Sequence, residues 1–162
     1  MKTASTWHAC FLTGLLLCIA GCALADRTLH TLPDLVFSNP RGCQFRLSSL
    51  DSDMQQCFGL NVRPGLLLLL AKRPDEEALV RQRALLKQVN AEQLSLLFIL
   101  GIAEDTHAPA EGYRLQSDQV APLLEGHRFR MMLIAPDGQV LLDSYLPVTA
   151  RKIHAALGLP QP

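Results

Sequence analysis

The fold is decided by residues 63–89, with the sequence RPGLLLLLAKRPDEEALVRQRALLKQV. Five consecutive leucines at 66–70 precede a polar corner at 71–77, and apolar residues at helical spacing follow. A short, continuous apolar run predicts a strand that is buried on both faces. Asp75 is the expected helix N-cap, with Glu76 and Glu77 at the positive end of the helix dipole. The stretch therefore predicts a strand followed by the helix of a crossover.

A second continuous apolar run, LSLLFILGI at residues 94–102, predicts another buried strand. Two such strands joined by a helix form a parallel βαβ unit. The segments around this unit also have recognisable patterns. We expect strands at 33–37 and 43–47, a short helix near 51–57, a polar loop at 103–116, a short helix at 117–125 that Pro122 weakens, paired strands at 129–135 and 139–144, and a last helix from 147–149 to Gly158.

The composition indicates one globular domain. The chain has 162 residues, 49% of them hydrophobic and 19% charged, and its formal net charge is zero. This balance excludes a disordered chain, and the absence of a basic excess argues against nucleic acid as a partner.

The N-terminus has the pattern of a secretory signal. Lys2 supplies a positive charge, and the apolar segment at 10–20 is shorter than a membrane-spanning helix requires. Ile19-Ala20-Gly21-Cys22 resembles the bacterial lipobox, which implies that Cys22 is lipidated and becomes the first residue. We favour this cleavage, which divides the chain into a signal at 1–21, a tether at 22–32 and a domain at 33–160.

The residue after Cys22 is Ala23 and not Asp, which by the same resemblance implies an outer-membrane lipoprotein facing the periplasm. The alternative is cleavage after Ala25, within the small-x-small pattern Ala23-Leu24-Ala25, which would release a soluble periplasmic protein.

Cys43 and Cys57 are the two cysteines left to pair, because Cys22 is either lipidated or removed with the signal. We expect a structural disulfide, because an exported protein meets an oxidising compartment. It would close a loop of about 15 residues and contribute roughly 3 kcal/mol. Two alternatives stay open: a redox-active pair, and two unpaired thiols. Their spacing is not C-x-x-C, so no helix N-terminus is evidently placed to lower a thiol pKa.

Two motifs resemble the thioredoxin-like fold of exported thiol-disulfide oxidoreductases and peroxiredoxins. Residues 32–37, Gly42 and residues 45–50 resemble the opening hairpin of those proteins, and MLIAPDGQV at 132–140 resembles their late strand and hairpin. The resemblance covers about residues 33–157. It implies an α/β three-layer sandwich, in which a central mixed sheet has an N-terminal β-hairpin and helices on both faces.

The departures from that family concern its chemistry. Pro74-Asp75-Glu76-Glu77 stands where the family has C-x-x-C, and Phe129 stands where it has a cis-proline. Disulfide exchange requires a thiolate, which these carboxylates cannot replace. The chain is more similar to a thioredoxin-like "domain of unknown function" family of exported bacterial proteins. That family also occurs in sushi-repeat and coiled-coil matrix proteins, shares Arg63-Pro64 and lacks the cysteine pair.

The expected function is therefore a non-catalytic binding or accessory module of the cell envelope, without a cofactor or catalytic residues. Its partner would be an envelope protein or a small ligand, with a lipid anchor in the membrane. The alternative is an oxidoreductase that uses Cys43 and Cys57.

Few other side chains form a candidate site. His30, His107, His127 and His154 have no metal-ligand spacing, so we expect no metal. Asp75, Glu76 and Glu77 are interpreted as a helix start rather than an acid–base cluster. Lys72 and Arg73, with Asp75, follow the central strand, where open α/β sheets bind ligands, and form a candidate ligand corner.

Overall fold

The computed structural model describes residues 32–50, 52–53, 55, 63–89, 93–104 and 112–160. In these residues a seven-stranded sheet has the order β2-β1-β5-β4-β3-β6-β7. Its strands are β1 (Val36–Ser38), β2 (Gln44–Arg46), β3 (Gly65–Ala71), β4 (Leu96–Ile102), β5 (Tyr113–Leu115), β6 (Phe129–Ile134) and β7 (Val140–Ser144). The described helices with assigned bounds are α2 (Glu77–Leu86), α3 (Ser117–Leu124) and α4 (Ala150–Ala156).

The leucine run forms the centre of the sheet, because β3 lies between parallel β4 and antiparallel β6. Every residue of β3 is buried, as the continuous apolar pattern predicts. Leu66, Leu68 and Leu70 belong to one core cluster, whereas Leu67 and Leu69 belong to the other. The alternation of side chains along a strand therefore distributes one apolar run between two cores.

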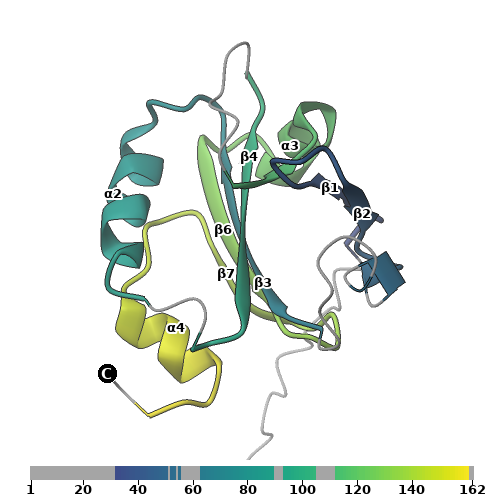
Figure 1. Ribbon diagram of the computed structural model, residues 1–162. Coiled ribbons are helices and arrows are strands. Elements are labelled where there is room, and N and C mark those ends of the chain that lie inside the picture. The colour runs from purple at the N-terminus through teal and green to yellow at the C-terminus, as the bar shows by residue number, and fades with distance from the viewer. Residues whose placement is uncertain are drawn as a thin grey trace, which may run out of the picture.

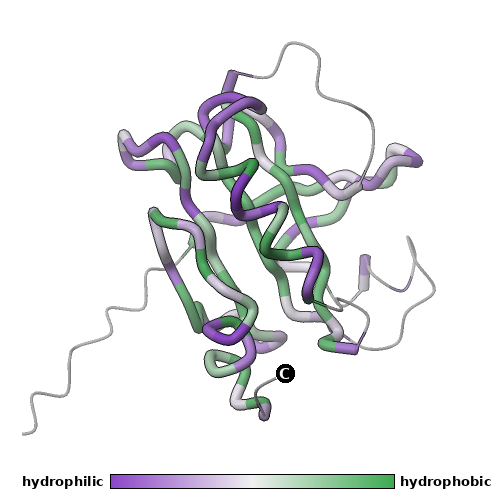
Figure 2. Tube along the Cα trace, turned by 90° about the vertical axis from the view of Figure 1, so that its left-hand side faces the viewer, coloured by the Kyte–Doolittle hydropathy of each residue, from purple (hydrophilic) through white to green (hydrophobic). Residues whose placement is uncertain are grey.

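The two cores lie on opposite faces of the sheet. Helices α2 and α4 cover one face, and α3 with the β1–β2 hairpin lies on the other (Figure 1). Viewed from the α2–α4 side, the central strands are largely hydrophobic, and hydrophilic colour lies in the turns and at intervals along the helix in front (Figure 2). The expected class, a mixed sheet with an N-terminal hairpin and helices on both faces, is confirmed.

Two local expectations are corrected. The loop predicted at 103–116 ends in a strand, β5, which pairs with β1 and β4. Its sequence, Tyr-Arg-Leu, is too short to carry a periodicity, so only its neighbours specify it. The N-cap of α2 is Glu76 rather than Asp75, and it makes no side-chain capping hydrogen bond. Ion pairs with neighbouring arginines hold Asp75 and Glu76 instead.

Pro122 does not prevent α3, which runs from Ser117 to Leu124 with the proline inside it. The helix loses one backbone donor there, but burial of Val120, Leu123 and Leu124 against the sheet compensates.

Gln82 holds α2 to the segment that precedes α4. It is fully buried, and its amide donates to the carbonyl of Val148 at 3.0 Å and accepts from the Val148 N–H at 2.5 Å. A buried side chain thus satisfies both backbone groups of one residue in a connecting segment. None of the helices in the described ranges is long and apolar enough to cross a membrane.

Candidate functional site

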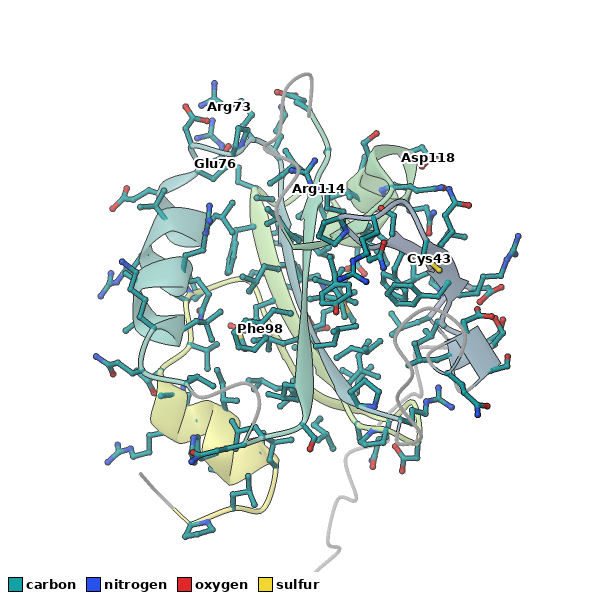
Figure 3. The ribbon with its side chains drawn as sticks, viewed as in Figure 1. Cys43, Arg73, Glu76, Phe98, Arg114 and Asp118 are labelled. Carbon is teal, nitrogen blue, oxygen red and sulfur yellow. The ribbon has the colours of Figure 1, made fainter. Side chains whose placement is uncertain are left out.

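The corner between β3 and α2 brings together charged residues from three segments. Residues 72–76 turn from the strand into the helix, and the Lys72 N–H donates to the Arg128 carbonyl at 2.9 Å. The Lys72 carbonyl accepts from the Glu104 N–H at 2.8 Å. Figure 3 shows Arg73 and Glu76 together beside the start of α2.

Glu76 is the buried member of this corner, with 8% of its surface exposed. Its Oε1 lies 3.7 Å from Nε of Arg73, and its Oε2 lies 3.9 Å from Nη1 of Arg128. The carboxylate is also at the positive end of α2, where a negative charge is favoured. We call Arg73, Glu76 and Arg128 the corner ion cluster.

The candidate ligand residues Lys72, Arg73 and Asp75 lie together, as the sequence predicts, and all three are exposed. Each cation has a carboxylate neighbour in the protein. Lys72 Nζ lies 3.2 Å from Glu104 Oε1, and Arg73 Nε lies 3.4 Å from Asp75 Oδ1. Exposed pairs of this kind are weak, so an anion could compete for either cation, and the ligand corner stays a prediction.

No sulfur is present at residues 72–77, where the polar corner leads into α2. Phe129 faces the corner from the neighbouring strand, because it pairs with Ala71, the last residue of β3. In the part of the chain that the structure describes, no peptide bond is cis. The corner between β3 and α2 therefore has an ion cluster and no thiol.

Cys43 lies far from this corner in the sheet order. It directly precedes β2, an edge strand that β1, β5 and β4 separate from β3. The Cys43 N–H donates to Oδ1 of Asn39 at 2.9 Å, and its carbonyl accepts from the Asn39 N–H at 2.9 Å. Cys57 and Cys22 lie outside the described residues, so their predicted roles stay predictions.

A second charged group, which the sequence analysis missed, centres on Arg130 of β6. Its side chain is 5% exposed, and its Nε and Nη2 donate to Asp143 Oδ1 and Oδ2 at 2.8 and 2.7 Å. Its Nη1 donates to Glu125 Oε1 at 2.7 Å and to the Leu123 carbonyl at 2.6 Å. We call Arg130, Asp143, Glu125 and Tyr145 the Arg130 network. The available signal was an arginine inside the apolar run FRMMLI.

Tyr145 closes this network from the solvent side. Its hydroxyl donates to Glu125 Oε2 at 2.8 Å, and its ring centroid lies 5.2 Å from Cζ of Arg130. Burial, followed by the hydrogen bond to Glu125, raises the pKa of Tyr145. The bidentate bond to Asp143 raises the pKa of Arg130 against the opposing effect of burial, so the guanidinium stays charged.

The structure describes two of the histidines, His127 and His154. The ring of His127 stacks on Tyr145 at a centroid distance of 3.7 Å, and Nδ1 of His154 lies 3.2 Å from the Pro160 carbonyl oxygen. His30 and His107 are outside the described residues. Within the described ranges, no three His, Cys, Asp or Glu side chains are grouped as metal ligands would be.

Comparisons with known proteins identify the fold. No protein-family model and no curated protein sequence matches this chain at a significant level. Among solved structures, a thiol-disulfide oxidoreductase from Bacteroides fragilis NCTC 9343 matches with a TM-score of 0.51 and 15% identity, covering 78% of this chain and 96% of that one.

Two further structures agree. BsSco, a member of the Sco family of cytochrome c oxidase assembly proteins, matches with a TM-score of 0.51 and 16% identity over 80% of this chain and 94% of that one. Thioredoxin peroxidase I from Plasmodium yoelii matches with a TM-score of 0.53 and 10% identity over 78% and 86%. With the mixed sheet and its helices on both faces, these similarities show that the chain has a thioredoxin-like fold.

Proposed function

We propose that this protein is an exported, lipid-anchored, thioredoxin-like module of the cell envelope that binds a partner and catalyses no disulfide exchange. The observation that carries the proposal is the corner ion cluster. Glu76, and not a cysteine, occupies the start of α2, and two arginines surround its carboxylate. A carboxylate at that position can hold a helix end, but it cannot attack a disulfide sulfur.

Export and anchoring rest on the N-terminal sequence. The basic Lys2, the apolar segment at 10–20 and Cys22 after Ala20-Gly21 support a lipoprotein signal and an outer-membrane location. Within the thioredoxin-like superfamily, Arg63-Pro64 and the missing C-x-x-C support affiliation with the exported "domain of unknown function" family that lacks this cysteine pair.

The alternative is an oxidoreductase that uses Cys43 and Cys57, and the thiol-disulfide oxidoreductase among the similar structures favours it as much as the binding module. Against it stands the position of Cys43 beside an edge strand, away from the start of α2. A disulfide at Cys43 supports pairing with Cys57, in either a structural or a redox role.

The rate at which dithiothreitol reduces insulin disulfides distinguishes the binding module from the oxidoreductase. We expect the purified protein to leave the uncatalysed rate unchanged, and Cys43→Ser with Cys57→Ser to lower the melting temperature without changing that rate. Turnover that the wild-type protein supports and the cysteine variant loses would establish the oxidoreductase.

Fractionation of cells tests the anchor. We expect wild-type protein in the outer-membrane fraction. We expect Cys22→Ser outside that fraction, either as soluble protein or as an unprocessed precursor. Cys18→Ser is the matched control, because it also replaces a cysteine near the cleavage site but leaves the lipobox at residues 19–22 intact. Cys22→Ser in the outer-membrane fraction, processed and at the wild-type level, would refute lipidation at Cys22.

A further inference from the structure

A cavity of about 380 Å³ lies between α2 and strands β3, β4 and β5 of the sheet. Leu69, Phe98 and Leu100 of the sheet and Leu86 of α2 supply apolar lining, and Arg83 of α2 and its C-cap residue Lys87 supply positive charge. Ile99, Gly112 and Tyr113 also line the cavity. Phe98 lies on the side of β4 that faces α2 (Figure 3). This volume falls within the roughly 300–1,000 Å³ of typical small-molecule sites.

The position of α2 explains the cavity. Gln82 holds the helix towards Val148, on the α4 side. Arg83 and Lys87 lie on the opposite flank of the buried stripe, towards β4. Phe98 and Leu100 consequently stay half-buried, whereas Leu96 and Ile102 on the same face of β4 are buried.

Arg83, in the last turn of α2, and Lys87, its C-cap residue, are exposed cations four residues apart, a spacing at which like charges repel. Neither forms an ion pair within the described residues, whereas Lys72, Arg73 and Arg130 all do. Interaction with the C-terminal end of the helix dipole favours a basic residue in this turn. The helix dipole accounts for the two cations, but it does not account for the half-buried apolar side chains beneath them.

We propose that this cavity binds a small amphipathic carboxylate, with an aliphatic body on Phe98 and Leu100 and its carboxylate at Arg83 and Lys87. An arginine can bind a carboxylate through two parallel hydrogen bonds, and a lysine adds a point charge. The site is at the C-terminal half of α2, whereas the corner ion cluster is at its start, so the inference goes beyond the proposed function and does not depend on it.

Binding can be measured with a reporter inside the cavity. Trp7 in the predicted leader is the only tryptophan of the chain, so Phe98→Trp in a Trp7→Phe background gives a single fluorophore in the lining. Decanoate below its micellar concentration is expected to change this fluorescence saturably. Decanol, which lacks the charge, is expected to bind about tenfold more weakly.

Substitutions on α2 test the role of the two cations. Arg83→Gln with Lys87→Gln is expected to weaken decanoate binding about tenfold and leave decanol binding unchanged. Arg81→Gln is the matched control, because this exposed arginine is on α2 but does not line the cavity. Circular dichroism of each variant verifies the fold. No saturable decanoate binding, or equal binding to the double variant and the wild type, would overturn the proposal.

Discussion

Arg130 of β6 and Asp143 of β7 form a two-point contact, with Nε 2.8 Å from Oδ1 and Nη2 2.7 Å from Oδ2. Glu125 contacts the same guanidinium through one oxygen. The Asp143 side chain is 32% exposed and that of Glu125 is 53% exposed. Solvent therefore screens the second pair more than the first.

Asp143→Asn is expected to lower the free energy of unfolding by about 2 kcal/mol, since it weakens two charged hydrogen bonds to a buried cation. Glu125→Gln is expected to cost less than about 1 kcal/mol, because its pair is more exposed. Urea denaturation of both isosteric variants measures the difference. Equal losses would contradict the assignment of Asp143 as the main partner of Arg130.

Gln82→Leu is expected to cost about 2–4 kcal/mol, because it leaves the N–H and carbonyl of Val148 without their partner. Gln88→Leu, at an exposed position just after α2, should change stability by no more than about 0.5 kcal/mol. Thermal or urea denaturation gives both values. A loss for Gln82→Leu no larger than that of the control would show that these hydrogen bonds do not hold α2 to the segment that precedes α4.

Gly101→Ala is expected to destabilise the fold by about 1–3 kcal/mol through overpacking. A Cβ at this position would lie 2.8 Å from Cγ2 of Val120 and 2.9 Å from Cδ2 of Leu70. Gly101→Val should cost more than the alanine variant, as its two methyl groups need further space. Melting temperatures in the order wild type, alanine, valine verify the crowding, and an unchanged alanine variant would disprove it.

Acid is expected to loosen the N-terminal hairpin. Hydrogen bonds from Ser48, chiefly its backbone N–H, lower the pKa of Asp34, and bonds from the Ser49 hydroxyl and the Arg46 N–H lower that of Asp53. In the unfolded chain an aspartate has a pKa of about 3.9, so as the pH falls below this value the unfolded state binds more protons than the folded state. The stabilisation from both carboxylates is present above that pH and is lost as the pH drops through the lower folded values.

Melting curves between pH 6 and about pH 2.5 measure this dependence across the unfolded aspartate pKa. Asp34→Asn with Asp53→Asn should flatten the decline of the melting temperature below about pH 4. Asp118→Asn serves as the control, because it removes an exposed aspartate of α3 outside the hairpin. If the melting temperature of the double variant declined with falling pH as steeply as that of the wild type, Asp34 and Asp53 would be excluded as the cause of the decline.

Much of the fold could be predicted because its signals are local. The run at 66–70 predicted a strand buried on both faces, and β3 has that burial. The turn at Pro136-Asp137-Gly138 predicted the pairing of β6 with β7. The strand β5 could not be predicted, because its three residues gain their pairing only from β1 and β4.

The candidate site, like the fold, could be predicted only in part from the sequence. The sequence alone determined that the corner after β3 has no thiol and is charged, because residue identity decides which nucleophiles exist. It could not determine that Glu76 is buried beside Arg128, since these residues meet only when β6 pairs with β3. The Arg130 network depends on α3, β6 and β7 coming together, and one arginine in an apolar run does not specify its partners.

Sequence by itself determined the central βαβ unit and the absence of a C-x-x-C, because both follow from periodicity and composition over neighbouring residues. Tertiary structure alone decided which charges are buried and where α2 leaves β4 half covered. Burial and cavities depend on contacts between residues far apart in the chain, such as Gln82 with Val148. The cavity beside Phe98 is therefore a property of packing that no local pattern encodes.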